Sequence, residues 1–256
     1  AMKQGYVDEG KPVLLVDAGD HIQGTAYGSM DNGATIIELM NEAGYDIATL
    51  GNHEFDYGMA RAKAIIKEAD FPYVSCNWVD LRTGLRVLPA VKLFPAGGKW
   101  IAFVGITTPE SFTKSTPAYF MNAKQTKYIY DILGGDDGKK LYDAVQKGID
   151  KAKALGADVI IGLGHLGVDP SSSPWTSKEV IEHTSGFDAF IDGHSHSTMS
   201  DIAALTGEDG TRDSLEPATL ALSTDQLARD YPRHATSLFN LVKNAEEAMR
   251  GLKKAE

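Results

Sequence analysis

Four apolar, strand-like runs of this sequence each pass directly into a short polar cluster that contains Asp, Asn or His. In α/β sheets, ligands bind beyond the carboxyl ends of the strands, so polar residues at such positions can meet at one place. Glycines beside these residues let the backbone approach an ion closely. The pattern therefore predicts one shared ligand site. The four clusters are Asp17-Ala18-Gly19-Asp20, Gly51-Asn52-His53-Glu54, Gly164-His165 and Asp192-Gly193-His194-Ser195-His196.

Strand-like and helix-like segments alternate along the chain, and this alternation predicts an α/β fold. The stretch 107–137 is aromatic-rich and longer than most loops, and insertions of that kind are usually functional or mobile. A strand-like stretch also holds the one cysteine, Cys76, for which we expect a buried structural thiol. We expect strands at 12–16, 45–50, 71–76, 159–163 and 189–191, a hairpin of 91–94 with 100–106, and helices at 34–44, 59–69 and 139–155.

Composition restricts the class of partner. The formal net charge is −10, and so acidic a surface repels a nucleic-acid backbone, so we expect no nucleic-acid partner. No apolar run reaches the roughly 18 residues of a membrane-spanning helix, so no membrane partner is expected either. These expectations favour a small-molecule ligand.

The residue types in the four clusters suit a divalent metal. Carboxylate, amide oxygen and imidazole together favour Mn, Zn, Fe, Co or Ni over a calcium cage or a thiolate zinc site. Each residue alone has a plainer interpretation: Asp20 and Asn52 as turn residues, and a single His as a structural residue. The prediction rests on four such clusters in one chain. Two metals about 3.5–4 Å apart would suit phosphoryl displacement, and Asp20 is the natural bridging carboxylate.

In order and spacing, the four clusters resemble the signature blocks of calcineurin-like metallophosphoesterases. The flanking segments 21–25 and 172–177 resemble the bacterial 5′-nucleotidase branch of that family. The resemblance covers about residues 10 to 200, and four blocks in order are highly specific. It implies a layered α/β sandwich of mixed sheets flanked by helices, and hydrolysis of a nucleoside phosphate or another small phosphoester.

The resemblance also implies a role for each residue. Asp20 would bridge two metals, one completed by Asn52, His165 and His194 and the other bound by His196. His53 would stabilise the transferring phosphoryl group and could protonate the leaving oxygen, and Asp56 would orient the His53 imidazole. Metal-bound hydroxide would attack phosphorus.

The sequence departs from the family pattern at one block. The family opens with a strand that ends in Asp-x-His and donates two ligands, and no Asp-x-His precedes the first cluster of this sequence. We therefore expect a fold incomplete at that strand. The metal held by Asp20, Asn52, His165 and His194 should be strong, and the one held by Asp20 and His196 weak. Two alternatives to a metal-dependent hydrolase remain. One is a truncated, non-catalytic domain that binds one metal and phosphate. The other is a packing or interaction module in which the polar residues after the strands are only structural.

The domain prediction follows from the same comparison. We expect one metallophosphoesterase domain over 1–256, with a helical tail at about 236–254 and without the nucleotide-binding domain of the family. The gap left by the strand would be covered by Ala218–Leu222, by the tail helix, or by a second copy of the chain in a homo-oligomer. Family members are commonly secreted, periplasmic or at the cell surface, and the sequence leaves the compartment of this chain open.

Overall fold

The computed structural model describes residues 2–197 and 221–223 of the chain. Its longer helices form where the sequence has apolar residues at helical spacing, and the residue after a helix can mark its end. One example is Gly44, which follows a helix and adopts φ 73°. The helices are α1 Met2–Asp8, α2 Ala26–Met30, α3 Ala34–Ala43, α4 Gly58–Glu68, α5 Ser111–Lys114, α6 Lys139–Ala154 and α7 Ser177–His183, with 3₁₀ turns η1 His53–Phe55, η2 Pro117–Phe120 and η3 Pro170–Ser172.

Three sheets form the interior. The largest has the order β10-β9-β8-β6-β5, in which only the β5–β6 pair is antiparallel. A second sheet pairs β1 with β2 in parallel, and a third, antiparallel sheet has the order β4-β3-β7. The strands are β1 Val16–Asp17, β2 Ile47–Ala48, β3 Trp78–Asp80, β4 Leu85–Arg86, β5 Val91–Ala96, β6 Lys99–Thr107, β7 Tyr130–Ile132, β8 Val159–His165, β9 Ala189–Asp192 and β10 Ala221–Ser223.

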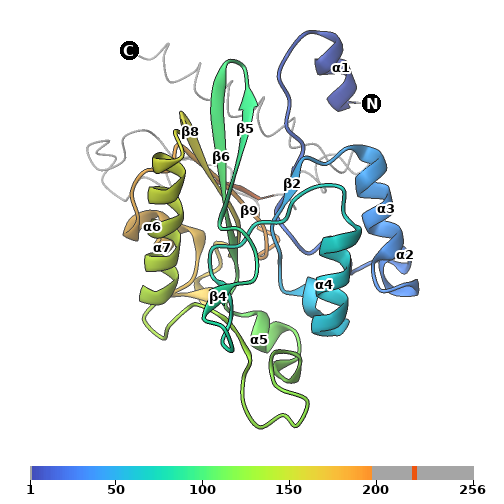
Figure 1. Ribbon diagram of the computed structural model, residues 1–256, viewed down its shortest axis with the longest axis vertical. Coiled ribbons are helices and arrows are strands. Elements are labelled where there is room, and N and C mark those ends of the chain that lie inside the picture. The colour runs from blue at the N-terminus through green and yellow to red at the C-terminus, as the bar shows by residue number, and fades with distance from the viewer. Residues whose placement is uncertain (1, 198–220, 224–256) are drawn as a thin grey trace.

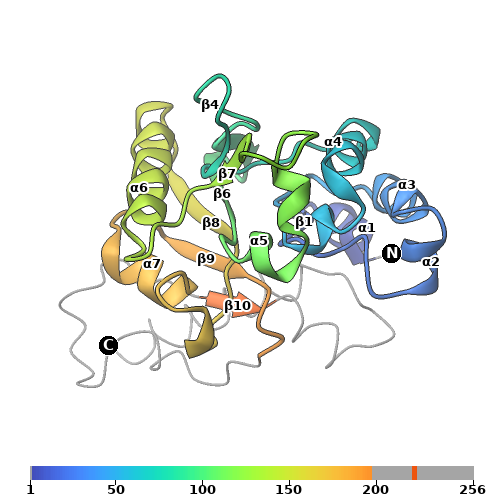
Figure 2. The same cartoon turned by 90° about the horizontal axis from the view of Figure 1, so that it is seen from below.

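These elements form layers. Helices α6 and α7 cover one side of the strands, and α2, α3 and α4 cover the opposite side (Figure 1). The view from the end where α5 lies shows the same division (Figure 2). This is the layered arrangement of mixed sheets between helices that the sequence predicts.

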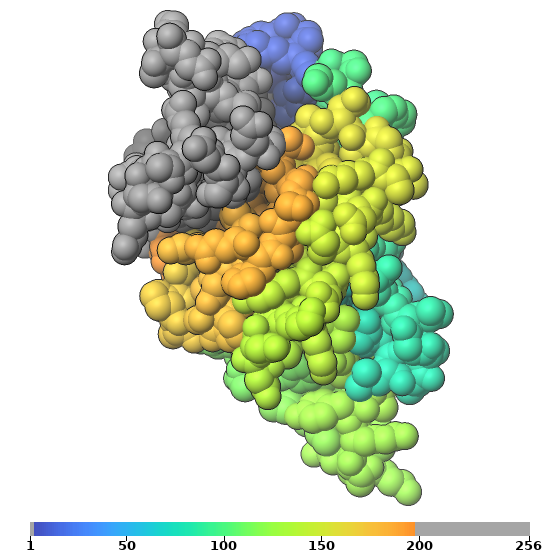
Figure 3. Space-filling view, turned by 90° about the vertical axis from the view of Figure 1, so that its left-hand side faces the viewer, coloured from blue at the N-terminus to red at the C-terminus, as the bar shows by residue number. Residues whose placement is uncertain are grey.

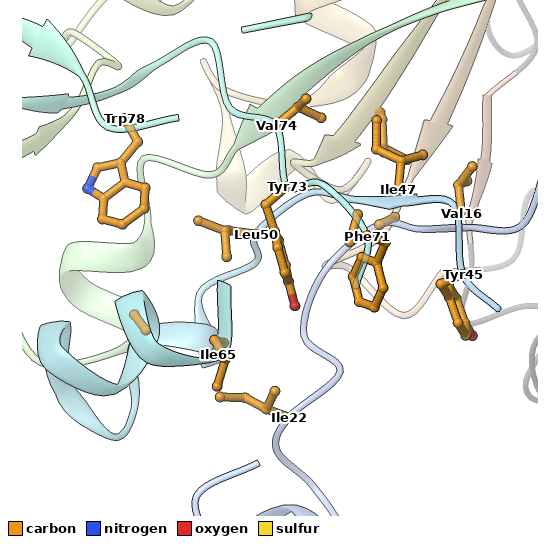
Figure 4. Close-up of a cluster of buried hydrophobic side chains, with 14 of the residues drawn as sticks. Val16, Ile22, Tyr45, Ile47, Leu50, Ile65, Phe71, Tyr73, Val74 and Trp78 are labelled. Atoms are coloured by element: carbon orange, nitrogen blue, oxygen red, sulfur yellow. The ribbon is translucent and has the colours of Figure 1, made fainter. Parts of the chain in front are cut away.

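Two apolar clusters hold the layers together. One joins the helices α3 and α4 to the strands β1 and β2, through residues such as Ile22, Ile47 and Ile65 (Figure 4). The other lies between the large sheet and α6, where Leu141, Val145 and Ile149 repeat every four residues and are fully buried. Burial drives both contacts, because removing apolar side chains from water contributes roughly 1.5–3 kcal/mol each.

Several predicted elements are confirmed. The hairpin forms around Gly97 and Gly98, which both have positive φ. The three predicted helices match α3, α4 and α6 within one residue at each end, and the strands at 159–163 and 189–191 match β8 and β9, which run two and one residues further. The Cys76 thiol is fully buried, and burial raises its pKa to about 12.

Three strand predictions were wrong in extent. β1 shares only Val16 with the predicted 12–16 run, and β2 covers only two residues of the predicted 45–50 run. The predicted strand at 71–76 is absent, and Tyr73 makes only an isolated bridge with Ala48. The reason is a change of partner along the segment: the N–H of Ser75 donates to the carbonyl of Pro89, and that of Cys76 to the carbonyl of Gly105. No single neighbour supports a continuous ladder there.

The segment 107–137 is an ordered insertion with elements of its own. It contains α5, η2 and β7, and the ring of Phe112 packs 4.5 Å from that of Phe120. The part between α5 and β7 projects from one end of the molecule (Figures 1 and 3). Of the C-terminal segment 218–222, residues 221 and 222 belong to β10, which pairs with β9. Residues 218–220 and the predicted helix at 236–254 lie outside the described residues.

Candidate metal centre

The polar clusters that follow the strands converge at one place. Asp20 follows β1, His165 ends β8 and His194 follows β9. One ligand-type atom from each of these three residues lies within 4.8 Å of the others. Asn52, His53 and His196 line one pocket together with Asp20 and His194. The structure therefore brings the predicted residues together, while their individual roles stay predictions.

The loop that carries Asp20 is held in an unusual backbone conformation. Asp20 has φ 64° and Gly19 has φ 93°, so the chain reverses sharply after β1. The neighbouring loop comes so close that a Cβ on Gly51 would lie 2.2 Å from Asp20 Oδ1. The N–H of His53 donates to the same carboxylate at 2.7 Å. Glycine at position 51 is thus required for this approach.

Glu54 connects these two loops. Its side chain is fully buried, and its carboxylate accepts the N–H groups of Asp20 at 2.8 Å and of Gly51 at 2.6 Å. It also accepts the N–H of His21 at 2.9 Å. Hydrogen bonds to a charged acceptor are the strong ones, so Glu54 fixes the spacing between Asp20 and the Asn52–His53 turn.

His21, to which sequence analysis assigned no role, is buried beside this carboxylate. Its ring bonds Asp17 through Nδ1 and Tyr73 through Nε2, each at 2.8 Å. Burial alone would lower the pKa of His21, but the carboxylates of Glu54 and Asp17 outweigh burial and raise it to about 9. The imidazolium therefore balances charge beneath the ligand loop.

His165 and Asn52 present atoms that have no hydrogen-bond partner. The Nδ1 of His165 bonds the carbonyl of Ala18 at 2.7 Å, which turns Nε2 toward Asp20. His165 Nε2 lies 2.9 Å from Asp20 Oδ2 but is not aligned for a hydrogen bond. Asn52 Oδ1 is also buried without a partner. Buried polar atoms of this kind are rare, and here they belong to residues that can ligate a divalent cation.

The charges of this group also fit a cation. Burial would raise the pKa of Asp20, but the adjacent His165 outweighs it and holds the pKa below its ordinary value. Burial would lower the pKa of His165, and the Asp20 carboxylate instead raises it to about 9. A divalent cation can take the place of the proton between these two side chains. The donor set therefore fits a borderline metal.

His194 completes the group and has a partner that sequence analysis missed. Its Nε2 bonds Glu110 Oε2 at 2.7 Å, and the hydroxyl of Ser172 donates to the same oxygen at 2.7 Å. Burial and the nearby His165 lower the pKa of His194. Glu110 comes three residues after β6, so the criterion of a polar residue beyond a strand end would have found it.

His53 faces the pocket without belonging to the close group of ligand atoms. Its Nδ1 bonds Asp56 Oδ2 at 2.5 Å, and 39% of the His53 side chain is exposed. Burial lowers the pKa of His53, but the hydrogen bond to Asp56 and nearby carboxylates outweigh it and raise the pKa. The ring is thus oriented by Asp56 and accessible from the pocket.

His196 is placed differently. It is exposed, has φ 52°, and lines the pocket outside the close group formed by Asp20, His165 and His194. The other residues that line the pocket are also polar. They are Lys114, Asp169, Ser171, Ser172 and Ser195.

The structure thus places a buried cluster of carboxylate and imidazole beside an oriented, accessible His–Asp pair, an arrangement of the kind that metal-assisted hydrolysis uses. Residues 1–198 match the family of calcineurin-like phosphoesterases, and the chain belongs to that family. Human 5′-nucleotidase is 34% identical over 194 residues, covering 73% of this chain and 30% of the human protein. The trifunctional nucleotide phosphoesterase protein YfkN of Bacillus subtilis is 30% identical over 237 residues, covering 81% of this chain and 15% of that protein.

Solved structures show the same fold. The crystal structure of calcineurin-like phosphoesterase YfkN from Bacillus subtilis has a TM-score of 0.66 at 27% identity, covering 86% of this chain and 70% of that one. The 5′-nucleotidase precursor from Thermus thermophilus has a TM-score of 0.61 at 25% identity, covering 86% and 38%. The chain spans less than a third of the human and Bacillus proteins that it matches in sequence. Within the described residues, no helix is long and apolar enough to cross a membrane.

Proposed function

We propose that this chain hydrolyses phosphoesters of nucleosides with the help of a divalent metal. The observation that carries the proposal is the group of Asp20, His165 and His194, whose ligand atoms lie within 4.8 Å of one another beside the pocket that His53 lines. Membership of the calcineurin-like phosphoesterases and likeness to nucleotidases support the same substrate class.

Four residues would hold the better-bound cation: Asp20, Asn52, His165 and His194. A neighbouring cation would be held by Asp20 together with the imidazole of His196, which lines the same pocket. When bound, such cations supply Lewis-acid stabilisation of phosphoryl oxygens and lower the pKa of water. The cation held by four residues should bind more tightly than the neighbouring one, because stable sites of this kind have about three or four protein ligands.

His53 acts on the substrate side. Its ring lines the pocket while Asp56 holds Nδ1, so Nε2 is the nitrogen left to approach a phosphoryl or leaving-group oxygen. The raised pKa of His53 favours the protonated ring, which can donate a proton to the leaving alkoxide. Asp56 keeps that ring in one orientation during the transfer.

The proposal is tested by phosphate release from a nucleoside monophosphate and from p-nitrophenyl phosphate, with Mn²⁺ and with chelator. We expect turnover only with the metal. The variant His53→Ala should lower turnover by about 10²–10⁴-fold, the usual weight of a general acid, with unchanged metal content. Loss of metal from this variant would contradict the role given to His53.

The non-catalytic alternative predicts a different outcome of the same measurement. A domain that only binds metal would take up Mn²⁺ in calorimetry and release no phosphate from either ester. That result would refute the hydrolase proposal and leave the metal centre in place. If the chain neither binds Mn²⁺ nor releases phosphate, the polar residues at the strand ends are only structural.

A further inference from the structure

We propose that Glu110 is a positioning residue that fixes the tautomer of His194, with the proton on Nε2 and the lone pair on Nδ1. The inference rests on the proposed metal-dependent function. Glu110 would not contact the cation or the substrate itself. It would act by presenting His194 in the one form that can ligate toward Asp20 and His165.

The contact between the two side chains determines the tautomer. An ionised carboxylate only accepts hydrogen bonds, and a neutral imidazole carries a proton on only one nitrogen. The 2.7 Å contact of His194 Nε2 with Glu110 Oε2 therefore places that proton on Nε2. Only 8% of the His194 side chain and 12% of the Glu110 side chain are exposed, so water cannot easily replace Glu110 as the acceptor.

The tautomer of His165 is fixed in the same way, but through the other ring nitrogen. Its Nδ1 bonds the carbonyl of Ala18, which leaves Nε2 as the ligating atom. The two rings lie edge to face, with centroids 5.0 Å apart. One nitrogen of each ring therefore contacts an acceptor of the protein, which leaves the other nitrogen of each ring for a cation. A ligating His commonly needs such an outer partner to fix its tautomer and orientation.

Glu110 also joins three segments that are distant in sequence. It follows β6, accepts from Ser172 of η3, and contacts His194 beyond β9. The helix α5 begins at the next residue, and the N–H of Lys114 at its end donates to the Glu110 carbonyl at 2.7 Å. Ser172 and Lys114 both line the pocket. Glu110 thus connects a proposed metal ligand with two other segments that line the pocket.

The variant Glu110→Ala tests the assignment in the whole chain. In the metal-free wild type, the ¹⁵N shifts of the His194 ring should report a proton on Nε2. The alanine variant should lose this single tautomer, and the affinity for Mn²⁺ alone, measured by calorimetry, should fall about 10–100-fold, as is typical of an outer partner. The variant Ser172→Ala is the control, because it removes the other hydrogen bond to the same oxygen and should keep both readouts near wild type.

Two results would overturn the proposal. One is an alanine variant with the wild-type tautomer and Mn²⁺ affinity, and the other is an equal loss of affinity in the Ser172 variant. If circular dichroism shows that the alanine variant does not fold, Glu110→Asp replaces it. Aspartate keeps the charge but is one methylene shorter, and the same loss of tautomer and affinity is expected. These readouts need no turnover, so a wild type that binds Mn²⁺ without hydrolysing esters would refute the proposed function alone.

Discussion

Glu54 is a fully buried carboxylate that ties together two loops of the candidate metal centre. Leaving such a charge without partners inside a protein is very unfavourable. Four backbone N–H groups and the imidazole of His21, whose Nδ1 lies 3.7 Å away, satisfy it. At the scale of single residues, the centre is therefore a charge-balanced network whose ligands depend on residues that face away from the pocket.

The pH dependence of stability should reveal the charge on His21. The pKa of His21 is raised from its ordinary 6.5 to about 9 in the folded chain, so its contribution is complete below about pH 6.5 and is lost as pH rises through about 9. We expect metal-free wild type to lose more unfolding free energy over this range than His21→Gln, measured by urea unfolding. The titration of His165 contributes to the unfolding free energy of both proteins, so it does not affect the difference between their pH profiles. Parallel pH profiles would contradict the assignment of charge to His21.

At the scale of elements, short strands deliver ligands through tight loops. β1 and β2 have two residues each, yet Asp20 and Asn52 are placed by the turns that follow them. The two loops lie so close together that a Cβ on Gly51 would be 2.2 Å from Asp20 Oδ1. The precision of the centre therefore resides in the two loops and their mutual contact more than in the length of the strands.

The variant Gly51→Ala should damage the centre directly. The added Cβ would lie 2.2 Å from Asp20 Oδ1, so the two loops must separate. Overpacking of this kind costs about 1–3 kcal/mol of unfolding free energy, and we expect weaker Mn²⁺ binding by calorimetry. Gly5→Ala is the control, because a Cβ there meets nothing within 4 Å and alanine favours the helix α1. Wild-type affinity in the Gly51 variant would show that the loops can relax without moving Asp20.

The sequence predicted the layered α/β fold, because apolar runs and helical spacing identify long elements such as α6, β6 and β8. The extent of short strands could not be predicted, since partner changes such as those of Ser75 and Cys76 depend on tertiary contacts. The site residues were predicted from their places beyond strand ends. His21 was missed, because a buried hydrogen-bond partner has no spacing that distinguishes it from a surface residue. Glu110 was also missed, although it lies just beyond the end of β6, where the strand-end criterion would have included it.

At the scale of the whole molecule, the candidate centre joins parts of the chain that are far apart. Its residues range from Asp20 to His196, and the loops that hold them are brought together only when both apolar clusters have formed. An unfolded chain therefore has no preformed site. A cation that binds the folded chain alone must stabilise it as a whole.

Removal of metal should therefore lower the thermal unfolding midpoint. A ligand at 100 times its Kd adds about 2.7 kcal/mol to the unfolding free energy. For a chain of this size each kcal/mol shifts the midpoint by roughly 2–4 °C, so we expect Mn²⁺ to raise it by about 5–10 °C over chelator-treated protein in calorimetric scans. Asp20→Asn is the control: its own midpoint is measured with and without Mn²⁺, and the difference should be small because the amide weakens the shared ligand. An equal shift in the wild type and the Asp20 variant would place the stabilising ion elsewhere on the acidic surface.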